Sequence, residues 1–203
     1  IDIPEDVSDE DGDTLIYSLV GEDANALNIS GNVVSFNGMP DYENPIDSDN
    51  DNIYKLNVVA SDGLLTSTSP EFTLSITNLN DNAPEFLDIP TTFEVTNGQS
   101  NVYDITVTDA DGDEVSLITG GTDGSLFTVS DSGNLSFTNA PDYSNPLDSD
   151  ADNVYKVVLI ANDGVYSTNS EEISITVLEV NNPPQISDLP SSITLDETSI
   201  DVI

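Results

Sequence analysis

Apolar residues occupy alternate positions in several short stretches of this chain, most clearly in Tyr54–Ala60, Phe72–Thr77 and Ile173–Leu178. Alternation over about four to eight residues is typical of a strand with one buried face. Turn-forming residues separate these stretches, and no stretch shows a convincing helical stripe. The sequence therefore predicts an all-β fold, built from β-sandwiches of about seven strands each. Shorter strands fit Thr14–Val20, Val33–Phe36, Val102–Thr108, Val115–Thr119 and Leu135–Thr138.

The chain contains one sequence unit twice. The segment Asp9–Asp13 returns as Asp109–Asp113, and the two basic residues, Lys55 and Lys156, occupy equivalent positions. A period of about 100 residues is the size of an independent domain. We therefore expect a first repeat at residues 1–83, a second at 84–183 and the opening strand of a third at 184–203. In this alignment the first repeat lacks its opening strand, and one hypothesis is that 184–203 of another molecule completes it by strand addition.

Composition excludes several functions. The 203 residues carry 39 Asp and Glu against 2 Lys and Arg, for a net charge of −37, and His, Cys and Trp are absent. Without imidazole or thiolate there is no zinc- or copper-type site and no Cys or His nucleophile chemistry. A chain this acidic repels nucleic acid and anionic membrane surfaces. No apolar stretch approaches the ~20 residues that cross a bilayer.

The acidic residues gather in short loops that recur with the period of the repeat. Calcium takes six to eight oxygen ligands, chiefly from carboxylates, amides and carbonyls. An Asp-x-Asp pair in extended backbone places both carboxylates on one side, where they repel unless a cation joins them. Asp, Asn and Gly also form ordinary turns, but recurrence of five clusters favours calcium. The clusters are Asp9–Asp13 and Asp109–Asp113, Asp41–Glu43 and Asp142–Ser144, Asp47–Asn52 and Asp148–Asn153, Asp62 and Asp163, and the linker Asn80–Pro84.

The segment Asn80–Phe86, Asn-Asp-Asn-Ala-Pro-Glu-Phe, resembles the linker of cadherin repeats. Asp41–Glu43 resembles the Asp-x-Glu motif of that family, and Asp109–Asp111 its Asp-x-Asp motif. The stretch from Asp41 to Tyr54 is most similar to cadherin-type modules of large bacterial surface adhesins. The resemblance covers nearly the whole chain and implies tandem seven-stranded Greek-key β-sandwiches.

The resemblance also implies calcium between neighbouring repeats. The implied ligands at the central junction are Asp41, Glu43, Asn80, Asp81, Asn82, Asp109, Asp111 and Asp163. Asp9, Asp11 and Asp62 would serve a junction with a preceding repeat. Asp142 and Asn182 would serve the next junction, which we expect to be weaker because Ser144 replaces the Glu.

The loops at 47–52 and 148–153 have Asp at the first, third and fifth positions, as in an EF-hand, but lack its Gly and distal Glu. Two interpretations remain open for them, namely independent calcium binding and a solvated polar loop.

Three function classes compete. The leading one is a calcium-rigidified repeat of an extracellular or cell-surface adhesin, acting in adhesion or as an extender rod, with neighbouring repeats and homophilic contacts as partners. The second is a polysaccharide-binding module, which the 6% aromatic content weakly opposes. A glycoside hydrolase needs paired carboxylates in distinct environments, and here they cluster with like neighbours, so we expect no enzyme.

Overall fold

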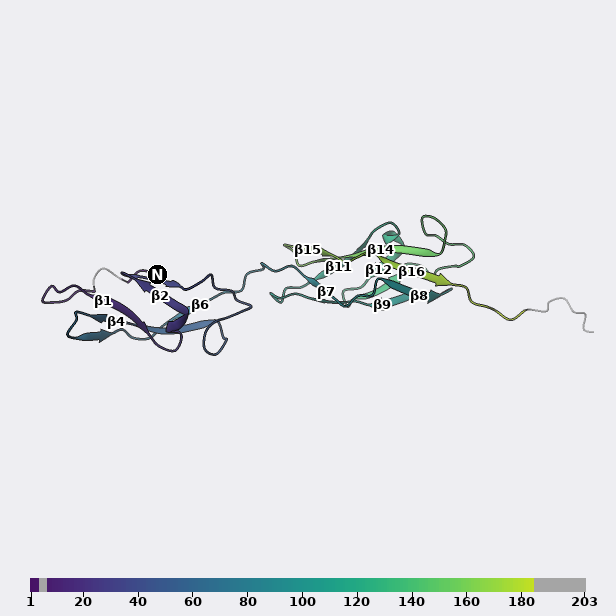
Figure 1. Ribbon diagram of the computed structural model, residues 1–203. Helices are drawn as coiled ribbons and strands as arrows, with labels where there is room; N and C mark the ends of the chain where they lie inside the picture. Colours follow the sequence, from purple (N-terminus) through teal and green to yellow (C-terminus); the bar gives the residue numbers. More distant parts are fainter. Residues whose placement is uncertain (4–6, 185–203) are drawn as a thin grey trace, which may run out of the picture. The chain divides into compact units, whose positions relative to one another are not determined.

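The computed structural model describes residues 1–3 and 7–184, and the predicted strand of a third repeat therefore lies outside the described residues beyond Pro184. The chain divides into two compact units. Unit 1 comprises residues 1–89, 105–118 and 160–170, and unit 2 comprises 90–104, 119–159 and 171–203. Within the described residues, strands and two short 3-10 turns make up the regular structure (Figure 1), so the predicted all-β fold is confirmed.

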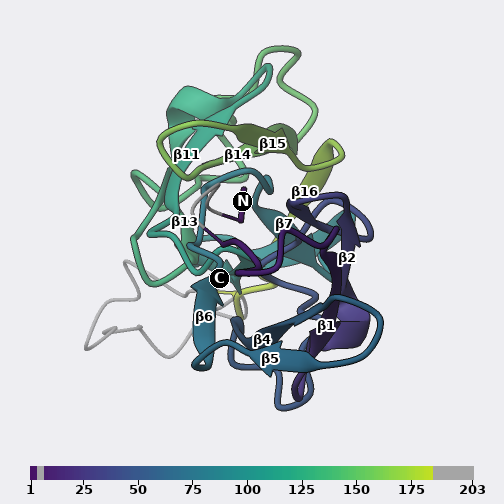
Figure 2. The same ribbon diagram turned by 90° about the vertical axis from the view of Figure 1, so that its left-hand side faces the viewer.

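Unit 1 is organised around its longest strand. Its elements are β1 (Ile16–Val20), η1 (Ala24–Ala26), β2 (Leu27–Ser30), β3 (Val33–Phe36), β4 (Ile53–Ser61), β5 (Thr66–Thr68), β6 (Phe72–Ser75), β7 (Glu85–Leu87), β10 (Thr106–Thr108) and β15 (Ser167–Asn169). Strand β4 pairs antiparallel with β1, β5 and β6, and β1, β4 and β5 lie side by side in Figure 2. Strands β2 and β3 form a second pair, and β7 pairs with β10. The core centres on Tyr54 and Leu56, whose alternate positions on β4 both face inward.

Unit 2 contains a mixed sheet and a three-stranded sheet. Its elements are β8 (Thr92–Thr96), β9 (Asn101–Asp104), η2 (Gly124–Leu126), β12 (Phe127–Val129), β13 (Asn134–Phe137) and β16 (Ile173–Leu178). Strand β16 runs antiparallel to β14 (Val154–Asn162) and parallel to β8, while β13 lies between β12 and β9. Strand β14 and β11 (Ser116–Gly120) each continue from one unit into the other along the chain.

The strongest periodic stretches become the strands that they predict. Tyr54–Ala60 lies within β4, and Val33–Phe36 is β3 itself. The single strand expected over Val102–Thr108 is wrong, because two strands meet at the buried Ile105. Strand β9 pairs with β13 and β10 pairs with β7, so the chain changes sheets at this residue.

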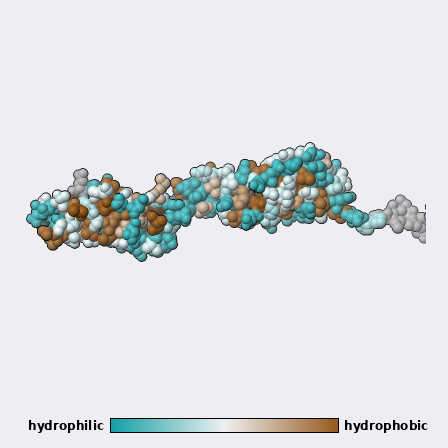
Figure 3. Space-filling view, in the orientation of Figure 1, coloured by the Kyte–Doolittle hydropathy of each residue, from teal (hydrophilic) through white to brown (hydrophobic). Residues whose placement is uncertain are grey.

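Apolar side chains also reach the surface of unit 1, as the brown areas of Figure 3 show. A groove of about 930 Å³ opens among Tyr17, Val58, Ala60 and Phe72. No helix of the described residues has the length and apolar character to cross a bilayer.

Candidate metal centre

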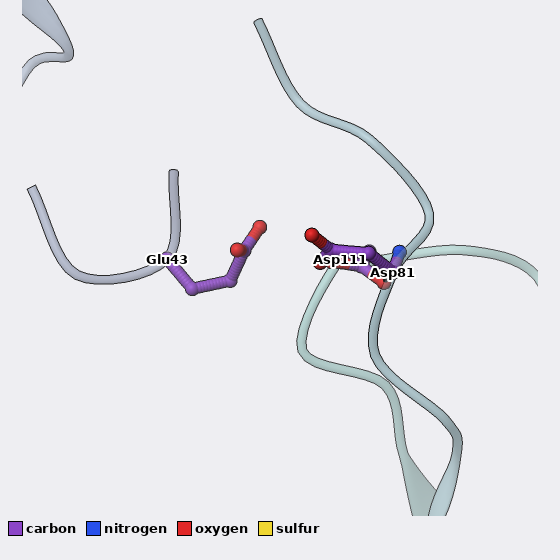
Figure 4. Close-up of side chains that lie close together, drawn as sticks. All are labelled: Glu43, Asp81 and Asp111. Atoms are coloured by element: carbon purple, nitrogen blue, oxygen red, sulfur yellow. Dashed lines mark hydrogen bonds between the residues drawn. The ribbon is translucent and has the colours of Figure 1, made fainter. Parts of the chain in front are cut away.

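Three carboxylates from distant parts of the sequence converge within unit 1. One oxygen of each of Glu43, Asp81 and Asp111 lies within 4.8 Å of the others. Figure 4 shows the Glu43 side chain extending from its own loop toward Asp111 and Asp81. Glu43 precedes β4, Asp81 precedes β7, and Asp111 follows β10. The two predicted repeats therefore both contribute to one cluster in one compact unit.

A tight turn after β10 presents Asp111. The Asp109 carboxylate accepts the Asp113 N–H at 3.2 Å, and the Asp109 carbonyl accepts the Gly112 N–H at 3.4 Å. Gly112 has φ +78°, a left-handed conformation that glycine adopts without steric cost. This turn brings a second group of carboxylate oxygens together, from Asp109, Asp111 and Asp113, again within 4.8 Å.

Asp111 also anchors the predicted linker. Its Oδ2 accepts the backbone N–H groups of Asp81, at 3.0 Å, and Asn82, at 2.8 Å, while its Oδ1 accepts the Asn82 side-chain amide at 2.8 Å. Asn78 donates to the Asp111 carbonyl at 2.7 Å. Burial acts to raise the pKa of Asp111, but the hydrogen bonds from Asn82 and Asp81 outweigh burial, and the pKa lies below its ordinary value. Asp111 is therefore held as a buried, ionised carboxylate.

Glu43 experiences the opposite balance. Partial burial raises its pKa above the ordinary value, and the negative charges of Asp111 and Asp81 raise it further. A raised carboxyl pKa means that the charged form is disfavoured where it stands. The cluster therefore carries an excess of negative charge that its own residues do not neutralise.

Four side-chain oxygens around this cluster are buried without any hydrogen-bond partner. They belong to Glu43 (Oε1), Asn80 (Oδ1), Asp109 (Oδ2) and Asp163 (Oδ2). A buried acceptor without a donor is costly, and carboxylate and amide oxygens are the ligands that calcium prefers. The donor set therefore fits an oxygen-coordinated divalent cation. Asn80 also donates to the Asp163 carbonyl at 3.5 Å, which joins these two residues.

Other predicted ligands mainly stabilise turns. Asp41 accepts the N–H groups of Glu43 and Asn44, each at 3.1 Å. Asp62 accepts those of Leu64 and Leu65, each at 2.6 Å. Such Asx turns occupy carboxylate oxygens locally. The remaining predicted ligands outside the central cluster, Asp9, Asp11, Asp142 and Asn182, belong to none of the carboxylate groups that converge within the described residues.

Two buried carboxylates outside these clusters were not among the predicted site residues. Asp23, 3% exposed, accepts the N–H groups of Ser48 and Lys55, each at 2.7 Å. Burial acts to raise the pKa of Asp23, but the hydrogen bonds from Lys55 and Ser48 outweigh it and lower that pKa. Gly21 lets this turn approach β4, since a Cβ there would lie 2.8 Å from the Leu56 Cα. Asp123 repeats the arrangement, and the only available signal was its offset of 100 residues from Asp23.

Comparisons with known proteins agree on the fold. No protein-family model matches the chain. The chain is 31% identical, over 193 residues, to "Cadherin-related family member 2" of Mus musculus, and this match covers 87% of the chain but 14% of the mouse protein. The crystal structure of human Protocadherin-24 EC1-2 aligns with a TM-score of 0.62 at 21% identity, covering 86% of both chains. Drosophila N-cadherin EC1-4 also gives 0.62, at 18% identity, over 83% of this chain and 42% of its own. The chain therefore has the β-sandwich fold of cadherin extracellular domains.

Proposed function

We propose that this chain is part of an extracellular or cell-surface adhesion protein, in which calcium ions join consecutive repeats. The proposed repeats are residues 1–83 and 84–183, and the proposed ligands are those expected from the sequence, centred on Glu43, Asp81 and Asp111. The observation that carries the proposal is the set of buried, unpartnered oxygens that both repeats contribute to unit 1. The likeness to cadherin-related family member 2 supports the adhesive role.

The residues of the chain already perform most of the positioning. Asp111 fixes the linker through two backbone N–H groups, and Pro84 is buried and restricts the backbone further. Calcium would supply positive charge to Glu43, Asn80, Asp81, Asp109, Asp111 and Asp163. An ion that takes ligands from both repeats would then restrain the linker between the two repeats. The expected result is a stiffer connection, as an adhesive or extender module requires.

The type of adhesion module is proposed from the sequence motifs. The Asp41–Tyr54 stretch supports a cadherin-type module of a bacterial surface adhesin, with neighbouring repeats and homophilic contacts as partners. Nothing in the described part of the chain favours polysaccharide binding over this role. Sugar stacking needs exposed aromatic rings, whereas the two tyrosines at equivalent positions of the repeats, Tyr54 and Tyr155, are 1% and 2% exposed and form core contacts.

Thermal melts with calcium and with chelator test the proposal. The informative variant is Asp81→Asn, which removes one charge from the cluster. Asp131→Asn is a matched control, because it makes the same charge change at an exposed turn of unit 2. Calcium should raise the melting temperatures of the wild type and the control by the same amount. It should raise the melting temperature of Asp81→Asn clearly less. An equal calcium response in all three proteins would contradict the proposal.

A further inference from the structure

A second type of acidic group lies away from the linker. One carboxylate oxygen of each of Asp47, Asp49 and Asp51 lies within 4.8 Å of the others. The copies Asp148, Asp150 and Asp152 form an equivalent group. Neither group shares a residue with the linker cluster. Each comes from one loop, immediately before β4 or β14.

Buried oxygens without partners distinguish this loop from an ordinary solvated turn. Asp47 is only 6% exposed, and its Oδ1 has no hydrogen-bond partner. Its Oδ2 accepts the Asp51 N–H at 2.8 Å, so one oxygen of the carboxylate builds the loop and the other remains unsatisfied. Asn52, 8% exposed, also has a buried, unpartnered Oδ1. Such oxygens are costly to bury unless a cation or another donor satisfies them.

The second copy repeats this arrangement with one difference. Asp148 is 5% exposed, its Oδ2 accepts the Asp152 N–H at 2.8 Å, and Asn153 Oδ1 is buried without a partner. Asp148 Oδ1 accepts a long hydrogen bond, 3.3 Å, from the Asn153 N–H. The recurrence shows that the sequence builds this geometry twice.

The surrounding structure holds the first loop in place before any ligand arrives. Asp23 accepts the Ser48 N–H at 2.7 Å, and the Tyr54 hydroxyl accepts the Ile46 N–H at 3.2 Å. The Asn52 side chain donates to the Tyr42 carbonyl at 2.9 Å. Asn52 also adopts φ +62°, a left-handed conformation, at the sixth loop position, where an EF-hand has its turn-forming Gly. The missing Gly is therefore not an obstacle, because Asn tolerates this conformation.

The loop already has a cation next to it. Lys55 Nζ lies 3.0 Å from Asp49 Oδ2 and 3.8 Å from Asp51 Oδ2. Lys156 Nζ lies 3.5 Å from Asp150 Oδ2 in the copy. One ammonium offsets one of three carboxylate charges, and it approaches from the exposed side of the loop, since the Asp49 side chain is 48% exposed. The Asp47 oxygen stays unsatisfied with the lysine in this position.

We propose that the Asp47–Asn52 loop and its copy Asp148–Asn153 each bind one calcium ion, at sites separate from the linker cluster. Lys55 and Lys156 act as internal cations that compete with calcium for Asp49, Asp51 and their copies. These sites lie within each repeat and do not depend on the linker ions. Their effect is to satisfy the buried, unpartnered oxygens of Asp47, Asn52 and Asn153, which precede β4 and β14.

Counting bound calcium in the full chain, by isothermal titration calorimetry, tests the proposal. The double variant Asp49→Asn, Asp150→Asn should lose two ions relative to the wild type and keep those of the linker. Asp81→Asn should weaken linker binding and keep both loop ions, so failure of the linker proposal and failure of this one give different results. The control Asp131→Asn should bind as the wild type does.

A second variant tests the competition and leaves every carboxylate intact. Lys55→Met with Lys156→Met should bind calcium at the loops roughly two- to fivefold more tightly, the range set by loss of an exposed ion pair. An unchanged number of bound ions in the double aspartate variant overturns the proposal. An unchanged calcium affinity of the loops in the double lysine variant also overturns it.

Discussion

The two kinds of acidic cluster differ in what assembles them. The loop cluster of Asp47, Asp49 and Asp51 comes from five consecutive residues, and a lysine lies 3.0 Å from one of its carboxylates. The linker cluster of Glu43, Asp81 and Asp111 joins three distant segments, and neither of the chain's two lysines is paired with it. Local hydrogen bonds hold the loop carboxylates together. At the linker, only the tertiary fold opposes the repulsion between the carboxylates of Glu43, Asp81 and Asp111. The linker cluster should therefore depend more on added cation than the loop does.

Removing calcium should have the largest effect. A ligand that binds only the folded state stabilises it by about 2.7 kcal/mol at a hundredfold excess over its dissociation constant. Chelation should therefore lower the melting temperature measured by circular dichroism. An unchanged melting temperature after chelation would contradict calcium binding at both the linker cluster and the loop cluster.

Loss of Asp23, a buried structural carboxylate that belongs to neither cluster, should destabilise the chain by a similar amount. Asp23→Ala leaves the buried N–H groups of Ser48 and Lys55 without their acceptor, which costs about 1–3 kcal/mol. The loss should appear in chemical denaturation with calcium and with chelator. A loss seen only with calcium would instead make Asp23 part of a metal site.

The same carboxylate predicts an acid response. The folded-state pKa of Asp23 lies below its ordinary value of 3.8, so its contribution to the free energy of unfolding is complete above that value and is lost as the pH falls through the lowered pKa. Asp23→Asn should show a shallower loss of stability with acid than the wild type. Parallel pH profiles would contradict this assignment.

A change at Asn78, which positions Asp111, should affect calcium binding at the linker cluster and leave the loop cluster unchanged. Asn78→Ala removes the hydrogen bond to the Asp111 carbonyl, and loss of a partner that orients a metal ligand typically costs roughly tenfold or more in metal affinity. Calorimetry should show weaker binding at the linker and unchanged binding at the loops. Uniform weakening would mean that the two clusters are not independent.

The smallest expected effect changes sign with calcium. Glu43→Gln relieves repulsion with Asp111 and Asp81, so the calcium-free protein should melt about 1–4 °C higher than the wild type. With calcium the variant loses a ligand and should gain less stability. The matched control is Glu114→Gln, at an exposed position. A variant that is less stable in both conditions would show that the cluster does not repel in the absence of the ion.

Sequence periodicity predicted the long strands because their burial alternates with the pleat. Strand β16 is the clearest of the predicted strands, with Ile173, Ile175 and Val177 buried at alternate positions. Short strands such as β5 and β15 have three residues each, too few to show a period. The break at Ile105 escaped prediction because an apolar residue there fits either sheet.

The local acidic loops were recognisable from spacing alone, and the linker cluster was not. Glu43 and Asp111 are far apart in sequence, and only the resemblance to cadherin repeats placed them together. Spacing also could not show that Asp41 and Asp62 use their carboxylates in turns. The roles of Asp23 and Asp123 depend on tertiary contacts with backbone N–H groups, which no sequence pattern encodes.

The most direct test of the linker cluster is anomalous diffraction from crystals grown with calcium. We predict anomalous difference density among the carboxylates of Glu43, Asp81 and Asp111, at a position that the buried oxygens of Asn80, Asp109 and Asp163 also reach. Well-ordered carboxylates at full calcium loading, with no such density among them, would contradict the account.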